Sequence, residues 1–221
     1  MTESKVWRRV ARIGWILCLL VGLAVKGFAQ KADQLLDNAA AAYEGSNGIK
    51  ASLVMQTRND RQQVAESWEG TVDMRGDKFL LKTPDMITWY DGKTQWVYME
   101  RNEEVNVSVP TGEELQMTNP AILLKQYKKD FTPTLKGEST TRRGKAAYEI
   151  ELLPKRKSTL VKVTLQIEKQ TEMPASIYVE AKNGTKMTIQ ISQIRTGLNQ
   201  PDSLFVFNEA DYPDAEVIDL R

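Results

Sequence analysis

The residues that most often perform catalysis are scarce in this chain. It contains no histidine, and its single cysteine, Cys18, lies in an apolar run near the N-terminus. Without histidine the usual general base, the commonest metal ligand and every serine–histidine pair are missing. No glycine-rich phosphate loop follows a predicted strand. We therefore expect no catalytic residue, no metal site and no cofactor, and we expect that the protein is not an enzyme.

Charged pairs are the remaining candidates for chemistry. Glu103-Glu104 and Glu113-Glu114 stand in predicted turns or loops, and two carboxylates can hydrolyse a glycosidic bond when they flank it. Adjacent loop residues seldom converge on one bond, so solvated charges are the simpler interpretation. The basic run Lys155-Arg156-Lys157 fits a solvated turn, or alternatively a docking patch for an acidic partner or a membrane surface.

Residues 1–29 have the pattern of a cleavable signal peptide. A basic start precedes an apolar run from Ile13 to Val25, and Gly27 and Ala29 are the small residues that cleavage after Ala29 would require. The competing interpretation is a membrane anchor, but the run is shorter than the ~20 residues that a spanning helix needs. We expect export, followed by one domain over residues 30–221.

The charge of that domain argues against nucleic acid as a partner. Loss of residues 1–29 removes five of the 30 basic residues and one of the 29 acidic residues, which leaves a net charge of −3. Binding to phosphate backbones needs a clear cationic surplus. The domain would also lack cysteine, so its stability must come from an apolar core and not from disulfides.

The stretch from Glu66 to Pro110 predicts a series of short antiparallel strands. An Asp-Gly pair such as Asp91-Gly92 between β-rich segments predicts a hairpin with a type I′ turn, in which both central residues have φ > 0. The valines near its end alternate with polar residues, which indicates one buried face. The expected strands are Thr71–Arg75, Phe79–Lys82, Met86–Tyr90, Thr94–Met99 and the segment containing Val105, Val107 and Val109.

Two helices are predicted outside this stretch. Lys31–Tyr43 has an apolar stripe that is mostly alanine, and Asn119-Pro120 provides an N-cap and a first-turn proline for a helix over Ala121–Tyr127. The remainder alternates as strands. These are expected around Ile49–Thr57, Tyr148–Leu152, Val161–Glu168, Ile177–Val179, Met187–Ile191 and a last strand marked by Phe205 and Phe207, with Val217-Ile218 in a short tail.

Strands outnumber helices, and most of them have one polar face. The pattern fits a sandwich of two sheets, and equally fits one strongly curved sheet whose concave side is partly filled by the helices. In the second arrangement the thin helices would leave apolar surface uncovered, which predicts a cavity for an apolar ligand. The pattern alone does not choose between them.

The order of these features resembles a known family. A signal peptide and a thin helix precede the block Asp91–Tyr98, which reads DGKTQWVY, and the apolar helix Asn119–Leu124 follows, before a long β-rich remainder. This is similar to the periplasmic outer-membrane lipoprotein carriers, the LolA family, across most of residues 30–221. The chain departs from the family at Gly76, where a proline usually follows the arginine. The segment between Leu81 and Asp91 is also shorter than in typical members.

The resemblance implies a mainly β fold with two or three helices. It implies a single curved antiparallel sheet, forming an unclosed half-barrel with a helical lid over an apolar cavity. Arg75 would bond to the lid and lock the empty form, although a surface charge beside a turn is the alternative for this residue. The residues expected in the cavity or its lid are Leu35, Leu36, Phe79, Leu81, Trp89, Trp96, Tyr98, Ile122, Leu123 and Leu124. Ordinary core packing is the alternative for Trp96 and Tyr98.

The function implied by the resemblance is transport of lipoproteins. A monomeric periplasmic carrier would take acylated lipoproteins from an inner-membrane ABC transporter and deliver them to an outer-membrane acceptor or to the membrane itself. The alternative is a lipid- or lipoprotein-sensing regulatory module of the cell envelope, since such sensors resemble the same half-barrel but usually carry another domain.

Overall fold

The computed structural model describes residues 30–59, 61–112, 114–115 and 120–221. The expected signal peptide and the N-cap Asn119 lie outside the described residues. Within the described ranges, no helix combines the length and the apolar character needed to cross a membrane.

Twelve strands of the described residues form one open sheet, in the order β12-β6-β5-β4-β3-β2-β1-β11-β10-β9-β8-β7. Neighbouring strands are antiparallel, except that β12 is parallel to β6. The strands are β1 (Ile49–Asn59), β2 (Val64–Arg75), β3 (Lys78–Lys82), β4 (Met86–Tyr90), β5 (Gln95–Met99), β6 (Glu104–Ser108), β7 (Phe131–Thr140), β8 (Ala146–Pro154), β9 (Leu160–Glu168), β10 (Pro174–Ala181), β11 (Thr185–Thr196) and β12 (Glu216–Asp219). The prediction of a single curved, unclosed sheet is confirmed, and the two-sheet sandwich is wrong.

The predicted hairpins form, with one difference in turn geometry. Gly76 has φ +60° between paired Arg75 and Lys78, a value that proline, fixed near −65°, cannot adopt. In the β4–β5 hairpin, where Asp91-Gly92 predicted a type I′ turn, only Gly92 has a positive φ. The Asp91 side chain instead accepts hydrogen bonds from the backbone nitrogens of Lys93 and Thr94 at 2.8 and 2.7 Å. The turn is therefore an Asx turn and not type I′.

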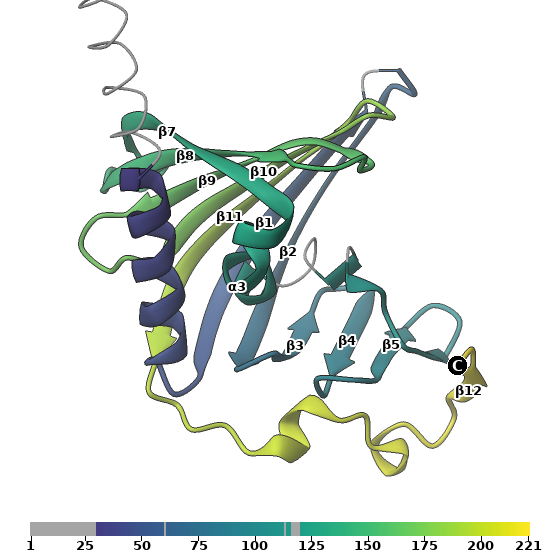
Figure 1. Ribbon diagram of the computed structural model, residues 1–221. Helices are drawn as coiled ribbons and strands as arrows, with labels where there is room; N and C mark the ends of the chain where they lie inside the picture. The colour runs from purple at the N-terminus through teal and green to yellow at the C-terminus, as the bar shows by residue number, and fades with distance from the viewer. Residues whose placement is uncertain (1–29, 60, 113, 116–119) are drawn as a thin grey trace, which may run out of the picture.

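Two helices lie on the inner side of the curved sheet (Figure 1). The N-terminal helix covers residues 30–44 and buries Ala32, Leu36, Ala39 and Tyr43. Helix α3 covers Pro120–Asp130, with Lys128 and Lys129 in its last turn, where positive charge favours the C-terminal end of the helix dipole. Both helices were predicted from sequence.

The C-terminal segment differs from the prediction. Phe205 lies in a 3₁₀ turn, Asp202–Phe205, and Phe207 follows it in irregular structure, so the strand predicted from these two residues is wrong. The tail residues Val217 and Ile218 instead form β12 at the edge of the sheet. Residues 197–221, which we call the C-terminal strap, run beneath β3, β4 and β5 in Figure 1 before they reach β6.

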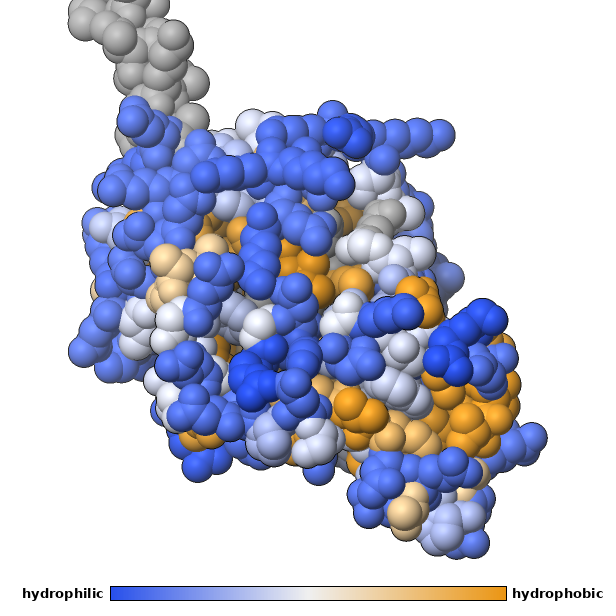
Figure 2. Space-filling model, turned by 60° about the horizontal axis from the view of Figure 1, so that its bottom comes forward, coloured by the Kyte–Doolittle hydropathy of each residue, from blue (hydrophilic) through white to orange (hydrophobic). Residues whose placement is uncertain are grey.

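The strap covers the outer face of the short strands. Phe205 is fully buried with Leu80 and Trp89, and the ring of Tyr212 lies 5.6 Å from Trp89 and 4.7 Å from Tyr98. Apolar side chains still gather on this part of the surface, towards the lower right of Figure 2. Val109, Val217 and Leu220, at or beside β6 and β12, are among the most exposed large apolar residues.

Replacement of Phe205 by alanine tests whether the strap is part of the core. Loss of a buried aromatic ring leaves a cavity, so Phe205→Ala should lower the free energy of unfolding by about 3–5 kcal/mol. Val206→Ala is the matched control, because its side chain is 39% exposed and it should cost less than about 1 kcal/mol. Equal effects of the two variants in urea unfolding would contradict this packing.

Candidate functional site

The inner face of strands β1 and β7 to β11 is a continuous apolar surface, which we call the trough. One row of cross-strand neighbours runs from β1 to β7, and a second runs parallel to it from β11 to β8. The rows are Met55, Ile189, Ile177, Leu165, Ile150 and Leu135, and Met187, Val179, Val163 and Leu152. The outer face is polar at the intervening positions, as in the row Gln190, Ser176, Gln166 and Glu149. This alternation produces a surface suited to apolar ligands on one side only.

In this conformation the two helices occupy the trough. Leu36 and Ala39 of the N-terminal helix, and Leu123 and Leu124 of α3, pack with both rows in one cluster. Ile122 joins a neighbouring cluster with Phe79, and Leu35 and Leu81 pack at the margins of these clusters. The apolar cavity expected under the helical lid is therefore filled by helix side chains in this conformation.

Three of the residues expected in the cavity lie on the other face of the sheet. Trp89 pairs with Leu80 and Trp96, and Tyr98 pairs with Ile87. All three aromatic side chains pack under the C-terminal strap. Side chains alternate between faces along a strand, so Phe79 and Leu81 face inwards while Leu80 faces outwards. The core-packing alternative thus describes Trp96 and Tyr98, and it applies to Trp89 as well.

Helix α3 is held to its surroundings by polar contacts at its rim. Lys125 Nζ lies 2.7 Å from the Asp77 carboxylate and 3.8 Å from Glu44. At the other end Lys128 pairs with Asp37 at 2.7 Å, and the Tyr127 hydroxyl donates to Asp37 at 3.0 Å or to the Asp33 carbonyl at 3.1 Å. Exposed ion pairs of this kind contribute about 0–1 kcal/mol each. They therefore favour one orientation of the helix on the sheet but add little to its stability there.

The tip of the β2–β3 hairpin joins both helices. Besides the Asp77 contact with α3, the Tyr43 hydroxyl of the N-terminal helix donates to the Gly76 carbonyl at 2.9 Å. Burial raises the pKa of Tyr43 above its ordinary value, and the Asp77 charge adds to this. Burial also raises the pKa of Tyr127, with a further contribution from its hydrogen bond to Asp37. Both hydroxyls therefore stay protonated, and remain hydrogen-bond donors, well into the alkaline range.

Arg75 contacts the C-terminal strap, where the resemblance implied a bond to the lid. Its guanidinium donates to the Gln200 carbonyl and to the Asp202 carboxylate, and it lies 6.0 Å from the ring of Phe205. Lys78 also pairs with Asp202, at 2.8 Å. In this conformation Arg75 holds the strap, while Lys125, Tyr127 and Tyr43 hold the helices. Sequence reasoning missed these three residues because their partners are distant in the chain.

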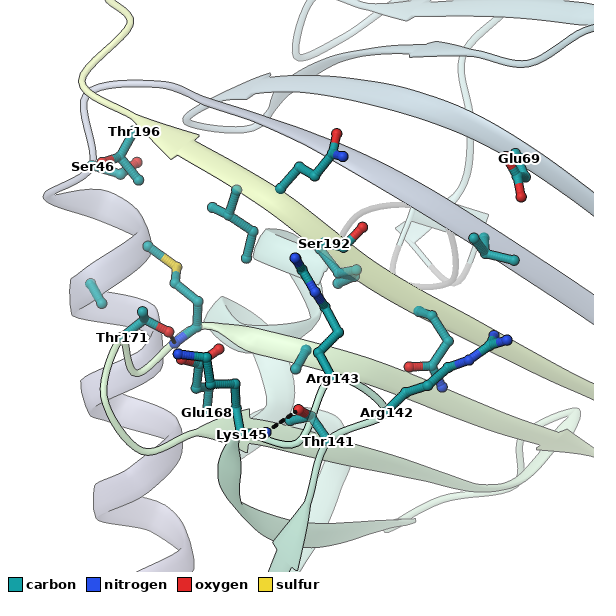
Figure 3. A pocket seen from close by; sticks show the side chains of 18 of the residues that line it. Ser46, Glu69, Thr141, Arg142, Arg143, Lys145, Glu168, Thr171, Ser192 and Thr196 are labelled. Carbon is teal, nitrogen blue, oxygen red and sulfur yellow. Dashed lines mark hydrogen bonds between the residues drawn. The ribbon is translucent and has the colours of Figure 1, made fainter.

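An open groove lies on the polar face of the sheet, away from the trough. Its volume is about 1270 Å³, and it runs from the end of the N-terminal helix across β11 and β1 to β2. The β7–β8 turn, with Arg142 and Arg143, forms one of its walls (Figure 3). Over the described ranges, no cluster of acidic residues is arranged to hold a metal ion.

Comparison with known proteins gives a family match over most of the chain. Residues 24–184 match the family described as outer membrane lipoprotein carrier protein LolA. An uncharacterized protein of Methanocaldococcus jannaschii is 23% identical over 195 residues, which cover 86% of this chain. The chain spans only about half the length of that relative (56%).

One solved structure supports the fold assignment. An uncharacterized conserved protein from Thermus thermophilus aligns with a TM-score of 0.58 and 15% identity, covering 86% of this chain and 99% of the other. A LolA superfamily protein from Nitrosomonas europaea is more distant, with a TM-score of 0.44, 15% identity and coverage of 80% and 97%. At such identities the likeness concerns the fold.

Alkaline pH should reduce the contribution of the two tyrosines to the free energy of unfolding, because they ionise more readily in the unfolded chain. Their pKa values are raised in the folded state, so their contribution to stability is complete below the ordinary tyrosine pKa of about 10 and is lost as the pH rises above it. The Tyr43→Phe/Tyr127→Phe variant should therefore lose less unfolding free energy than the wild type between about pH 9 and pH 11. Urea unfolding at each pH measures this, and parallel curves for both proteins would contradict it.

Removal of the Arg75 side chain should release the strap and leave the helices in place. In Arg75→Leu, hydrogen exchange should accelerate in residues 200–207, because the bonds to Gln200 and Asp202 are lost, while α3 stays protected. Lys125→Ala should show the reverse pattern. Faster exchange in α3 of Arg75→Leu, with an unchanged strap, would restore the lid-lock role that the family resemblance implied.

Proposed function

This chain belongs to the LolA family of outer membrane lipoprotein carrier proteins, whose fold is that of lipoprotein- or lipid-binding carriers, and we propose that it carries lipoproteins by holding their acyl chains in the trough. The carrier would act in the periplasm without enzymatic activity. It would receive lipoproteins from an inner-membrane ABC transporter and pass them to an outer-membrane acceptor or membrane, acting as a monomer. Residues 1–29 would direct its export.

The observation that supports this proposal is the trough itself. Its two rows of apolar side chains cross strands β1 and β7 to β11 without a polar interruption at the described positions. In the empty protein, side chains from two short helices take the place that acyl chains would occupy. A carrier must both hide its cargo from water and release it, and a cover made of separable helices meets both requirements.

The energies of cover and cargo are of similar size. Helix α3 buries Ile122, Leu123, Leu124 and Tyr127, and full burial of such side chains is worth about 1.5–3 kcal/mol each. Displacement of α3 would thus cost roughly 6–12 kcal/mol. An acyl chain gains about 0.8 kcal/mol per buried CH₂ group, or roughly 11 kcal/mol for about 14 groups. One or more acyl chains can therefore replace the helix, and loss of the chains returns it.

Loading with an acylated peptide tests the proposal directly. The protein, purified from cells that express the full chain, is mixed with a tripalmitoylated peptide in mild detergent, and the detergent is then removed. We expect a soluble complex in size-exclusion chromatography and native mass spectrometry, together with faster hydrogen exchange in α3. If the peptide is recovered only as aggregate, at every protein concentration, the protein is not such a carrier.

A variant that removes the rim contacts of α3 tests whether this helix moves during loading. Lys125→Ala removes the contacts with Asp77 and Glu44, which should speed loading by about two- to fivefold, as expected for an exposed ion pair. The matched control is Lys136→Ala, because Lys136 pairs with Glu151 at 3.4 Å on the sheet, away from both helices. If both variants speed loading equally, the faster loading results from the lost positive charge and not from opening of α3.

A further inference from the structure

The sheet opens between β10 and β11 beside the N-terminal helix. The two strands pair from Glu180–Lys186 to Ser176–Gln190, and the remainder of β11, Ile191–Thr196, is paired with β1 but not with β10. Two local features end the ladder. Pro174 at the start of β10 has no backbone donor, and β11 carries a bulge, with Gln193 at φ +51°, where its register against β1 shifts.

This opening forms the inner end of the groove described above. Met173 and Ala175 stand on one side, Ile191 and Ile194 on the other, and Ala42 of the N-terminal helix also lines it. Met173 is buried in the core cluster around Ile122, and Ala42, Ile191 and Ile194 pack against that cluster. The groove therefore leads from solvent to apolar side chains of the core without passing under α3.

The outer part of the groove is polar and is overhung by arginines. Gln56, Ser67 and Ser192 line it from the outer face of the sheet. In Figure 3 the side chains of Arg142 and Arg143 extend from the β7–β8 turn in different directions over the groove that they line. Both arginines are exposed, and the hydrogen bonds and ion pairs described for this part of the chain leave their guanidinium groups without a partner.

The turn that carries the arginines is well defined. Thr141 N donates to the Lys145 carbonyl at 2.8 Å, and Gly144 N donates to the Thr141 carbonyl at 2.9 Å. The Thr141 hydroxyl accepts from Lys145 N at 3.1 Å, and Gly144 has φ +77°, which glycine adopts at little cost. The turn thus places the two arginines at the wall of the groove, and a guanidinium group can bind phosphate oxygens in a bidentate way.

We propose that this groove binds an anionic phospholipid, with the phosphate at Arg142 and Arg143 and one acyl chain in the opening between β10 and β11. The basic residues that line the groove, Arg142, Arg143 and Lys145, outnumber its acidic residues, Glu69 and Glu168, and its apolar end suits an acyl chain. A volume of about 1270 Å³ exceeds the ~300–1,000 Å³ of ordinary small-molecule pockets. The polar end of the site lies on the opposite face from the trough, and its inner end reaches the core cluster around Ile122. The site therefore goes beyond lipoprotein transport, and its arginines can be tested separately from the trough.

Binding of lysolipids to the purified full chain tests the site. The probes are palmitoyl lysophosphatidylglycerol, which is anionic, palmitoyl lysophosphatidylcholine, which is zwitterionic, and inorganic phosphate, each measured by calorimetry below micelle-forming concentrations. We expect the anionic lipid to bind at least tenfold more tightly than the zwitterionic one. Equal affinities for the two lipids, or phosphate binding as tight as the anionic lipid, would overturn the proposal; the second result would indicate a site for free anions.

Paired variants separate the arginines from general charge. Arg142→Gln/Arg143→Gln should lower the affinity for the anionic lipid by about ten- to a hundredfold, because charge-assisted hydrogen bonds are lost. The variant should also no longer prefer the anionic lipid over the zwitterionic one. Arg156→Gln/Lys157→Gln is the matched control, since it removes the same charge from another exposed turn. Equal losses in the two variants would show that only net charge matters.

A third variant tests the opening, and the trough assay remains as a separate readout. Ala175→Phe should weaken both lysolipids at least tenfold by filling the space between the strands, and should leave loading of the tripalmitoylated peptide unchanged. If Ala175→Phe binds the lysolipids as tightly as the wild type does, the acyl chain does not lie in this opening. If the wild-type protein binds lysolipids but does not load the tripalmitoylated peptide, the carrier function is wrong and the lysolipid site in the groove still holds.

Discussion

The structure depends on one constraint, which is that a wide open sheet has an apolar inner face that cannot remain in water. Rows of aliphatic side chains cross the trough from β1 to β7, and the strands do not close on themselves to cover it. The N-terminal helix and α3 provide the cover. Their apolar faces are narrow, and their rim contacts combine exposed ion pairs with the hydrogen bonds of Tyr43 and Tyr127. A cover of this kind fits the proposed transport of acyl chains, in which the helices separate from the sheet and return.

The outer face, the edge and the β10–β11 junction of the sheet are covered to different extents. The C-terminal strap buries the aromatic side chains of the short strands. Strand β12 pairs with β6 and becomes the edge of the sheet in its place, and its four residues form the kind of short edge strand that limits pairing with other chains. Between β10 and β11 the sheet is left open, and polar residues with two arginines surround that opening. The molecule therefore offers two chemically different surfaces, an apolar one beneath the helices and an amphipathic one on the outer face.

Local sequence signals predicted the local structure well. The strands around Gly76 and Asp91-Gly92 and both helices were found because turn residues, caps and alternation act over a few positions. The same local reasoning failed at Phe205 and Phe207. The run Phe205-Val206-Phe207 consists of residues typical of strands, but Phe205 is a buried member of a 3₁₀ turn. The type I′ turn at Asp91 failed because its side chain caps the backbone instead.

Composition and short periods were enough to predict that strands predominate and where the two helices lie. The face that each residue takes and the partner that it meets follow only from the folded chain. Trp89 faces away from the trough because side chains alternate along β4, and Arg75 meets Asp202, 127 positions away. The opening between β10 and β11 likewise arises from a proline in one strand and a bulge in the other, and their juxtaposition exists only after the strands pair.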